Sequence, residues 1–295
     1  PRSVSSAASD VYKRQNCLIY NLNMTNKVLI PGEIIELELI EIVEVTHDTK
    51  RFRFGFPNKS DILGLPTGKS ISLTFDDENG EQVFRSYTPV SSDNDTGFVD
   101  FVVKIYRKNE HPDFPEGGLM SQKIDTLEIG DKFGFRGPNG RLEYSGNGEF
   151  IIKQLKSQGG GEIIKKVSNI GMIAGGTGIT PMIQIIRAVL RDEQDPTKIN
   201  LLFANKKEED IILRDKIENR REDFSDKFNF FYTLDQPPED WDGFTGFINE
   251  EMISKTMPPP NDDTLILLCG PPKMNVLVKN ALEEIGYSKE SIFNF

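Results

Sequence analysis

Hydrophobic and polar residues alternate through the first half of the chain. Apolar residues take every second position over several stretches between Glu33 and Phe56, which is the period of a strand with one buried face. The pattern returns in 71–75, 82–90, 98–106 and 131–136. Asp76–Gly80 is a hairpin turn signal, and Gly137–Gly140 is expected to end the last of these strands. Short strands with such turns predict an antiparallel β-barrel.

The second half follows a different period. Apolar strands are predicted at 168–174, 199–204, 228–234 and 264–269. Helical spacing is predicted at 181–192, 209–221 and 273–285. Because strands and helices alternate here, we expect a parallel sheet in an α/β domain. The fold class is therefore two-domain, with the antiparallel barrel followed by the parallel-sheet domain.

The two patterns suggest domain boundaries. We expect a disordered or non-native leader at 1–30, the barrel at 31–148, a linker or loop at 149–166 and the α/β domain at 167–295. The glycines at 159–161 favour the linker interpretation. The leader is rich in Ser and Ala but lacks the apolar segment of a signal peptide, and Met24 is a plausible natural start.

Composition narrows the function classes. The 295 residues carry a formal net charge of -11 and a pI near 4.9, which argues against nucleic-acid binding. Two cysteines and two histidines are too few for a disulfide framework or an iron–sulfur cluster, and we expect no metal site. They favour a reducing, cytoplasmic location. No apolar run has transmembrane length, although peripheral association with an intracellular membrane stays open.

A glycine-rich turn follows the first strand of the second half. Gly176 and Gly178 lie before Pro181, where a helix is predicted to begin. Glycines let the backbone approach a pyrophosphate, and the free N–H groups of a helix N-terminus favour its negative charge. The spacing differs from the usual G-x-G-x-x-G. A tight strand-to-helix turn without a ligand is the alternative interpretation.

Two further groups lie at predicted strand ends, which is where ligands bind in open parallel sheets. Cys269-Gly270-Pro271 follows one strand, and its thiol is placed to pack against a nicotinamide ring. The second half of the chain has no histidine to activate it as a nucleophile, and a buried free cysteine is the common alternative. Asp235 follows another strand and is suited to accept from a ribose hydroxyl and to repel a 2′-phosphate, which favours NADH over NADPH. Without the other motifs, a solvated turn acid would be the better interpretation.

The first half has its own candidates. Arg85 and Tyr87 share one face of a strand, where a guanidinium binds phosphate and an aromatic ring stacks on a planar group. Thr88 adds a hydroxyl. Gly117-Gly118 precedes a possible helix and is suited to a second pyrophosphate. His47 is a candidate proton carrier. For each, an ordinary strand, loop or surface residue is the alternative.

Taken together and in this order, the motifs resemble the NADH–cytochrome b5 reductase family of the ferredoxin reductase-like superfamily. The resemblance runs from about Ile34 to Phe295. It includes 47–54, 62–66, Arg85–Ser92, His111-Pro112, Gly117-Gly118, 120–122, 135–138, Gly171–Met182, 201–205, 232–235 and Cys269–Pro272.

The resemblance implies an FAD-binding barrel, an NADH-binding α/β domain, hydride transfer from NADH to FAD and one-electron transfer to an acceptor such as cytochrome b5. It implies a catalytic set of His47, Thr88, Thr180 and Cys269, with His47 in a hydrogen-bond network with Thr88. It assigns FAD to Arg85, Ser86, Tyr87, Thr88, Val102, Lys104, Tyr106, Gly118, Leu119, Met120 and Ser121. It assigns the nucleotide side to Gly175, Gly176, Thr177, Gly178, Thr180, Pro181, Asp235, Cys269, Gly270, Pro271 and Met274, with Phe295 beside the flavin.

The chain departs from the resemblance at two positions. Leu119 stands where the family often has a basic residue, and Ser86 stands where it often has proline. Leu119 weakens the expectation of a cationic docking face for an acidic cytochrome. The alternatives are a nitrate-reductase-like or flavohaemoprotein-like reductase module with another acceptor, or a non-catalytic nucleotide-binding module.

Overall fold

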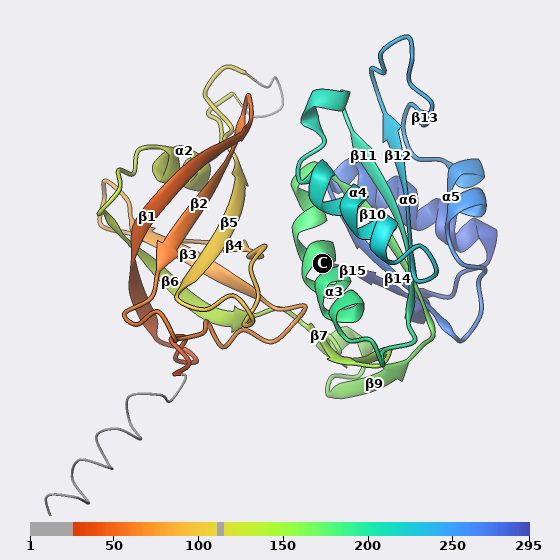
Figure 1. Cartoon of the computed structure of the whole chain (residues 1–295), viewed down its shortest axis with the longest axis horizontal. Coiled ribbons are helices and arrows are strands. Elements are labelled where there is room, and N and C mark those ends of the chain that lie inside the picture. Colours follow the sequence, from red (N-terminus) through yellow and green to blue (C-terminus); the bar gives the residue numbers. More distant parts are fainter. Residues whose placement is uncertain (1–25, 111–114) are drawn as a thin grey trace, which may run out of the picture.

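The computed structural model describes residues 26–110 and 115–295. It contains two six-stranded sheets and a small three-stranded sheet, which lies at the lower end of the second domain in Figure 1. Residues 1–25 of the expected leader and the pair His111-Pro112 lie outside the described residues. Lys27–Ile30 are an exception, because the backbone N–H groups of Val28 and Leu29 donate to Ile62 and Leu63, and Leu29 is buried in the barrel. The barrel therefore begins before residue 31.

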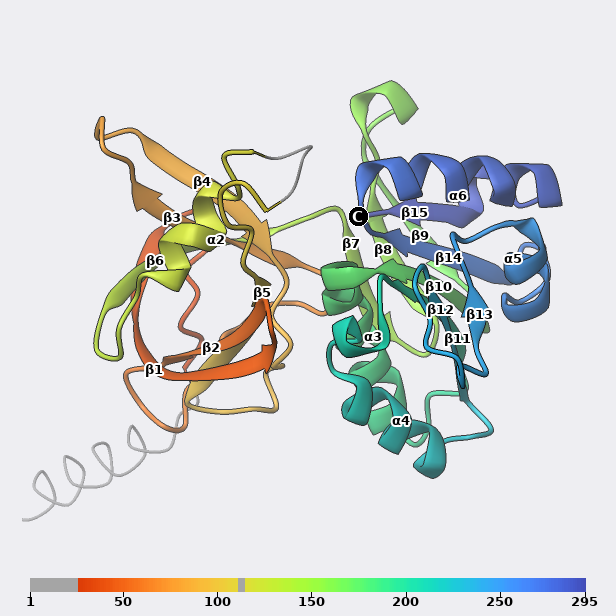
Figure 2. The same cartoon turned by 90° about the horizontal axis from the view of Figure 1, so that it is seen from above.

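The first sheet is antiparallel and curls into a barrel, as Figure 2 shows from its open end. Its order is β4-β3-β6-β1-β2-β5. The strands are β1 (Ile34–Thr46), β2 (Thr49–Gly55), β3 (Ser70–Asp76), β4 (Gln82–Tyr87), β5 (Phe98–Lys104) and β6 (Lys132–Asn139), and α2 (Leu119–Asp125) follows β5. In the described chain the ladder does not close between β4 and β5, which are its two edges.

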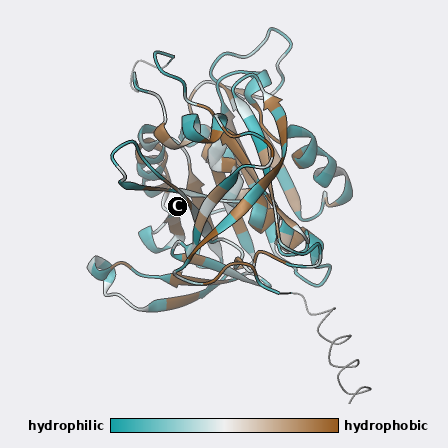
Figure 3. Ribbon diagram, turned by 90° about the vertical axis from the view of Figure 1, so that its left-hand side faces the viewer, coloured by the Kyte–Doolittle hydropathy of each residue, from teal (hydrophilic) through white to brown (hydrophobic). Residues whose placement is uncertain are grey.

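Alternation of hydrophobic and polar residues builds the barrel core, and it is visible along the barrel strands in Figure 3. Phe54 is fully buried and contacts three other rings, with centroid separations of 4.9 Å to Phe135 and 6.2 Å to Phe101. Such aromatic clusters combine a large buried area with favourable ring geometry. The prediction of an antiparallel barrel is confirmed, but β6 continues to Asn139 through the turn signal that was expected to end it. Ser70 of β3 pairs with Asn139 of this extension, across a bulge that separates it from the pair of Ser72 with Arg136.

The second large sheet is parallel, with the order β13-β12-β11-β10-β14-β15. Its strands are β10 (Asn169–Gly175), β11 (Lys198–Asn205), β12 (Phe228–Leu234), β13 (Phe244–Thr245), β14 (Thr264–Cys269) and β15 (Ile292–Asn294). The helices are α3 (Ile179–Arg191), α4 (Arg214–Asp223), α5 (Glu250–Thr256) and α6 (Pro272–Ile285). Apolar residues of α3 and of α6 pack in separate clusters against the sheet, so the two faces are both covered. The α/β prediction is confirmed.

Two sequence expectations are wrong in detail. Residues 149–166, expected as a linker, form β8 (Glu149–Lys153) and β9 (Glu162–Lys166), which pair with β7 (Leu142–Gly146). Each of these strands has only five residues and one buried face, so their alternation was too short to be recognised in the sequence. The helix expected from residue 209 begins at Arg214, because Leu213 has a left-handed φ of 59° and interrupts the helical turn. The short β13, α5 and β15 had no prediction.

The small sheet belongs structurally to the second domain. Leu142, Tyr144, Phe150 and Ile152 are buried in the same cluster as the strands and α3 of the α/β domain. The Tyr144 hydroxyl donates to Asp195, which precedes β11. Within the described ranges, no helix is long and apolar enough to cross a membrane.

Candidate functional site at the domain junction

The carboxyl end of the parallel sheet carries the nucleotide motifs. β10 has β11 on one side and β14 on the other, and the chain leaves β10 through the glycine turn. Chain connections diverge at this point, which is where open α/β sheets bind ligands. The turn after β14 holds Cys269-Gly270, so the structure brings the two motifs together at neighbouring strand ends.

The glycine turn has the two properties that a phosphate-binding loop needs. Gly176 has a φ of 53°, and a β-carbon there would have no atom within 4 Å, so the space beside it is open. A β-carbon on Gly178 would lie 2.2 Å from the Cys269 carbonyl oxygen, so only glycine lets the two turns approach so closely. The Thr180 hydroxyl donates to the Thr177 carbonyl at 3.1 Å and fixes the first turn of α3.

The turn after β14 is held by α6 and by the chain end. The Asn275 side chain donates to the Gly270 carbonyl at 3.0 Å, and the Phe295 backbone donates to the Leu268 carbonyl at 3.1 Å. Met274 lies against the glycine positions, where a β-carbon on Gly175 would come 2.6 Å from its sulfur. The predicted neighbours Cys269, Met274 and Phe295 are therefore close together.

Burial raises the pKa of the Cys269 thiol to about 11. The thiol is therefore protonated near neutral pH, and the thiolate is the nucleophilic form. This agrees with the sequence argument that Cys269 packs against a ligand and does not attack it.

Asp235 lies at the end of β12, two strands from the glycine turn, and its side chain is exposed. Its pKa is raised by partial burial, and the neighbouring Lys206 opposes the rise.

Asn205 lies at the end of β11, between the glycine turn and Asp235, and sequence reasoning did not select it as a site residue. It is 7% exposed, and neither atom of its amide has a hydrogen-bond partner in the described structure. The sequence signal that could have identified Asn205 is a polar residue at the end of an apolar strand.

The barrel contributes its two edge strands. On β4, Arg85 is exposed and Tyr87 is half-buried. Burial raises the pKa of the Tyr87 hydroxyl to about 12; nearby Tyr106 adds to the rise and Arg85 opposes it. The structure thus brings three predicted flavin residues together. Ser86 is exposed and Thr88 half-buried on the same segment.

On the opposite edge, β5 carries Val102 and Lys104. Val102 is buried in the hydrophobic cluster of the α/β domain, and β5 lies against the glycine turn at 176–178. The Lys104 ammonium lies 2.6 Å from Asp48 Oδ2. β5 is therefore the strand of the barrel at which the flavin motif and the nucleotide motif meet.

The predicted network between His47 and Thr88 is not present in the described structure. The His47 side chain is 61% exposed and lies 3.5 Å from Asp48 and 3.8 Å from Asp210, which belongs to the α/β domain. No hydrogen bond joins it to Thr88 within residues 26–110 and 115–295. His47 lies in the turn between β1 and β2, and that turn faces the second domain.

The second glycine pair is shaped by its neighbours. Gly117 has a φ of 70°, and a β-carbon there would lie 2.4 Å from the Tyr106 carbonyl. The Ser121 hydroxyl accepts from the Tyr106 N–H at 3.1 Å and donates to the Gly118 carbonyl at 3.0 Å. The hydroxyl is therefore already used by the backbone. Met120 is buried in the barrel core, which leaves it only backbone groups for a ligand, and Leu119 is 52% exposed.

Two side chains of α3 fasten the second domain to the barrel. Arg187 donates to the Val90 carbonyl and to Asp95, both at 2.6 Å. One turn earlier, Gln184 accepts from the Gly68 N–H at 3.0 Å. Since the first turn of the same helix carries the glycine motif, these contacts fix the distance from the nucleotide motif to the barrel.

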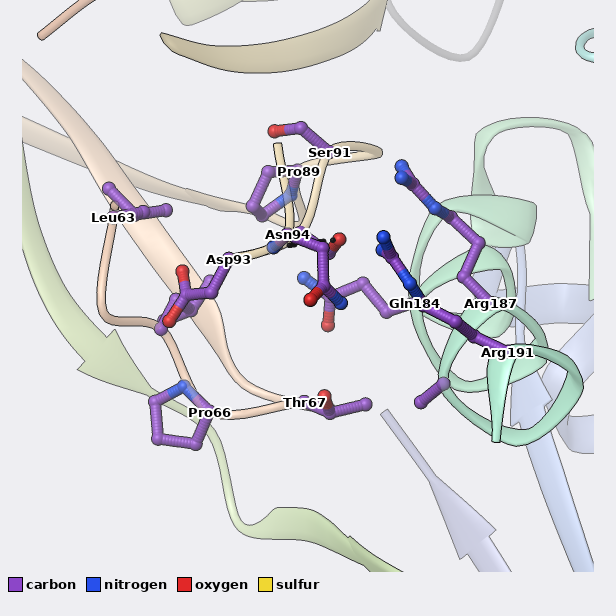
Figure 4. Close-up of a pocket in the computed structure, with 13 residues that line it drawn as sticks. Leu63, Pro66, Thr67, Pro89, Ser91, Asp93, Asn94, Gln184, Arg187 and Arg191 are labelled. Carbon is purple, nitrogen blue, oxygen red and sulfur yellow. Dashed lines mark hydrogen bonds between the residues drawn. The ribbon is translucent and has the colours of Figure 1, made fainter. Parts of the chain in front are cut away.

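A pocket lies beside this attachment. Figure 4 shows Gln184, Arg187 and Arg191 of α3 on one side and barrel loops with Thr67 and Asn94 on the other. None of the predicted cofactor residues lines it. It is a gap at the domain junction, separate from the strand ends that carry the nucleotide motif.

A barrel with an exposed arginine and aromatic edge, joined to a parallel sheet with an open glycine turn, defines a two-domain flavin- and pyridine-nucleotide-dependent oxidoreductase. The model of the oxidoreductase FAD-binding domain matches residues 36–144, and that of the oxidoreductase NAD-binding domain matches residues 172–280. The chain is 51% identical to NADH-cytochrome b5 reductase 3 of Rattus norvegicus, over 88% of this chain and 85% of that protein. It is 48% identical to NADH-cytochrome b5 reductase 1 of Homo sapiens, over 91% and 87%. The chain belongs to the NADH-cytochrome b5 reductase family.

Solved structures agree with the fold. The cytochrome b5 reductase domain of Ulva prolifera nitrate reductase superimposes with a TM-score of 0.83 at 37% identity, covering 91% of this chain and all of that one. A flavohemoglobin from Malassezia yamatoensis, at 18% identity, has a TM-score of 0.67 and covers 94% of this chain and 62% of its own. The second likeness shows the fold alone.

We predict that Arg187→Ala weakens the domain junction. Loss of two charge-assisted hydrogen bonds should lower the free energy of unfolding by about 1–2 kcal/mol, allowing for partial solvent exposure. It should also slow flavin reduction by NADH about tenfold, because α3 then positions the glycine turn less firmly. Chemical denaturation and stopped-flow absorbance measure the two effects. Arg191→Ala is the control, since Arg191 is exposed one turn further on α3. Equal behaviour of the two variants would contradict the role.

We predict that Cys269 reacts slowly with iodoacetamide near neutral pH. Only the thiolate reacts, so a pKa of about 11 means that the rate rises about tenfold per pH unit well above pH 9. An unperturbed thiol, with a pKa of about 8.5, would level off near pH 9.5. The rate is followed by mass spectrometry after Cys17, the other cysteine of the chain, has been replaced by Ala, and a plateau below pH 9.5 would refute the assignment.

Proposed function

We propose that this chain takes hydride from NADH onto bound FAD and passes the electrons singly to cytochrome b5. One observation carries the proposal. The glycine turn of the nucleotide domain lies against β5, the barrel edge that bears two of the predicted flavin residues, Val102 and Lys104. The proposed FAD site and the proposed NADH site thus adjoin, as contact between the flavin and nicotinamide rings requires.

The strand ends suit a dinucleotide laid across them. In order along the sheet they carry Cys269 on β14, Gly176 after β10, Asn205 on β11 and Asp235 after β12. Neighbouring strands lie about 4.8 Å apart, so Gly176 and Asp235 are about two strand spacings apart. We assign the nicotinamide to Cys269, the pyrophosphate to the glycine turn and the adenosine ribose to Asp235.

Asn205 supports this assignment. A buried amide without a partner costs about 1–3 kcal/mol, and Asn205 lies between the two proposed contacts. We propose that its amide gains a hydrogen bond when the nucleotide binds. The open space beside Gly176 is the matching space for phosphate oxygens.

The residues of the barrel edge fit FAD. We assign the Arg85 guanidinium and the backbone N–H groups after Gly118 to its phosphates, and Tyr87 to its ring. Arg85 is exposed, and its only hydrogen bond in the described structure runs from Nη1 to the Phe84 carbonyl, so most of its donors remain for a phosphate. FAD supplies the step from two-electron to one-electron chemistry, and the protein holds the two rings in contact.

The acceptor is assigned from relatives. Curated relatives about half identical to this chain are named NADH-cytochrome b5 reductases, whereas the nitrate reductase domain is 37% identical. We therefore propose cytochrome b5 as the acceptor and a cytoplasmic location, with peripheral membrane association open.

The direct test is the visible spectrum of the purified chain before and after anaerobic NADH. We expect a yellow protein that bleaches with NADH and reoxidises with cytochrome b5. Bleaching without reoxidation by cytochrome b5 would remove the acceptor and keep the chemistry. A protein that takes up no FAD would refute the function.

We predict that Asp235→Thr narrows the preference for NADH over NADPH. A carboxylate repels the 2′-phosphate of NADPH, and threonine removes that charge while keeping a hydroxyl for the ribose. The ratio of kcat/KM values for the two nucleotides should fall by about tenfold or more, which corresponds to about 1.4 kcal/mol. Asp240→Asn, an exposed acid in the following loop, is the control. An unchanged ratio would remove Asp235 from the ribose site.

A further inference from the structure

One cluster of ligating side chains spans the two domains, and it includes His47, which makes no hydrogen bond to Thr88 within the described residues. It comprises His47 and Asp48 in the turn between β1 and β2, and Asp210 in the short turn at Glu208–Asp210 after β11. Each offers one ligand atom, and the three atoms lie within 4.8 Å of one another.

The cluster is open to solvent on one side and enclosed on the other. The side chains of Asp48 and Asp210 are 16% and 13% exposed, and that of His47 is 61% exposed. An ion therefore has access from the imidazole side and meets two largely buried carboxylates.

The oxygens differ in how far they are already used. Asp210 Oδ2 accepts from the Lys207 N–H at 3.0 Å, while Oδ1 faces His47. Asp48 Oδ1 accepts from the hydroxyls of Thr46 and Thr49. Asp48 Oδ2 faces His47 and is paired with Lys104 at 2.6 Å.

The charge of the cluster favours a cation. Two carboxylates face one ammonium group, that of Lys104.

We propose that His47, Asp48 and Asp210 bind a divalent transition-metal ion such as Zn²⁺ and so link the barrel to the α/β domain. Imidazole and carboxylate ligands suit this ion, with metal–nitrogen and metal–oxygen distances of about 2.0–2.2 Å and a water in the fourth position. Tetrahedral ligand atoms are then about 3.3–3.6 Å apart, whereas the three candidate atoms lie within 4.8 Å of one another. The side chains must therefore approach one another to hold the ion, and His47 must supply a single nitrogen to it. This revises the expectation from composition that the chain has no metal site.

Binding has a consequence at the flavin edge. Asp48 Oδ2 cannot hold both the ion and the Lys104 ammonium at 2.6 Å, so Lys104 is released from its partner. Lys104 lies on β5 beside the glycine turn. The ion therefore fixes the distance between the domains and also alters a side chain at the junction, and we expect it to inhibit turnover reversibly.

The test is calorimetric titration of the oxidised, FAD-loaded full chain with Zn²⁺ alone. We expect one ion per chain and a higher midpoint of thermal unfolding. His47→Gln and Asp210→Asn should each weaken the affinity at least tenfold, because each removes one ligand. Asn at 210 still accepts from the Lys207 N–H, so the local turn is kept. Glu209→Gln is the matched control; it removes the same charge from the adjacent residue and should leave the affinity unchanged.

A second measurement separates this site from metal effects elsewhere. Zn²⁺ should slow reduction of the wild-type flavin by NADH, with recovery on addition of EDTA, and should have much less effect on Asp210→Asn. Failure of Zn²⁺ to bind, or equal affinity in wild type, His47→Gln and Asp210→Asn, would overturn the proposal. Neither result depends on whether cytochrome b5 is the acceptor, because binding is measured without it.

Discussion

The position of α3 is the constraint on which the rest of the structure depends. Its first turn follows directly from the glycine motif, and further along it is fastened to the barrel by Gln184 and Arg187. A rigid helix rises 1.5 Å per residue, so contacts about two turns from the motif determine where the glycine turn lies relative to β5. Two domains with separate cores thereby act as one frame for two reacting rings, and catalysis of this kind depends on such positioning.

Close packing of turns makes the site possible. Gly178 lies against the backbone of the turn after β14, and Gly175 lies against Met274. The two turns approach so closely that no side chain fits between them. Gly176, whose β-carbon direction is open, is the exception. Neighbouring atoms pack against Gly175 and Gly178, whereas the space beside Gly176 is open, and a phosphate can reach backbone N–H groups there.

Much of the fold was predictable because its signals are local. Alternation marked the barrel strands, and β12 and β14 were placed to the residue. The errors occur where local signals are weak. Residues 149–166 looked like a linker because glycines at 159–161 dominate a hairpin with one buried face. The helix at 209–221 began late because Leu213 takes a left-handed conformation, which propensity does not reveal. His47 was paired with Thr88 by resemblance, but its described neighbours are acids of both domains.

The sequence alone determined the residue types that carry the chemistry: glycines at a strand-to-helix turn, an arginine and a tyrosine two apart, and a cysteine and an aspartate at strand ends. Motif and periodicity are properties of neighbouring residues, so they can be read along the chain. The tertiary structure decided which of these groups meet. It placed the glycine turn against β5, left the Asn205 amide buried with no hydrogen-bond partner among the described residues, and brought Asp210 within 3.8 Å of His47, 163 residues earlier in the chain. Such contacts depend on how two domains pack, and no local pattern encodes that packing.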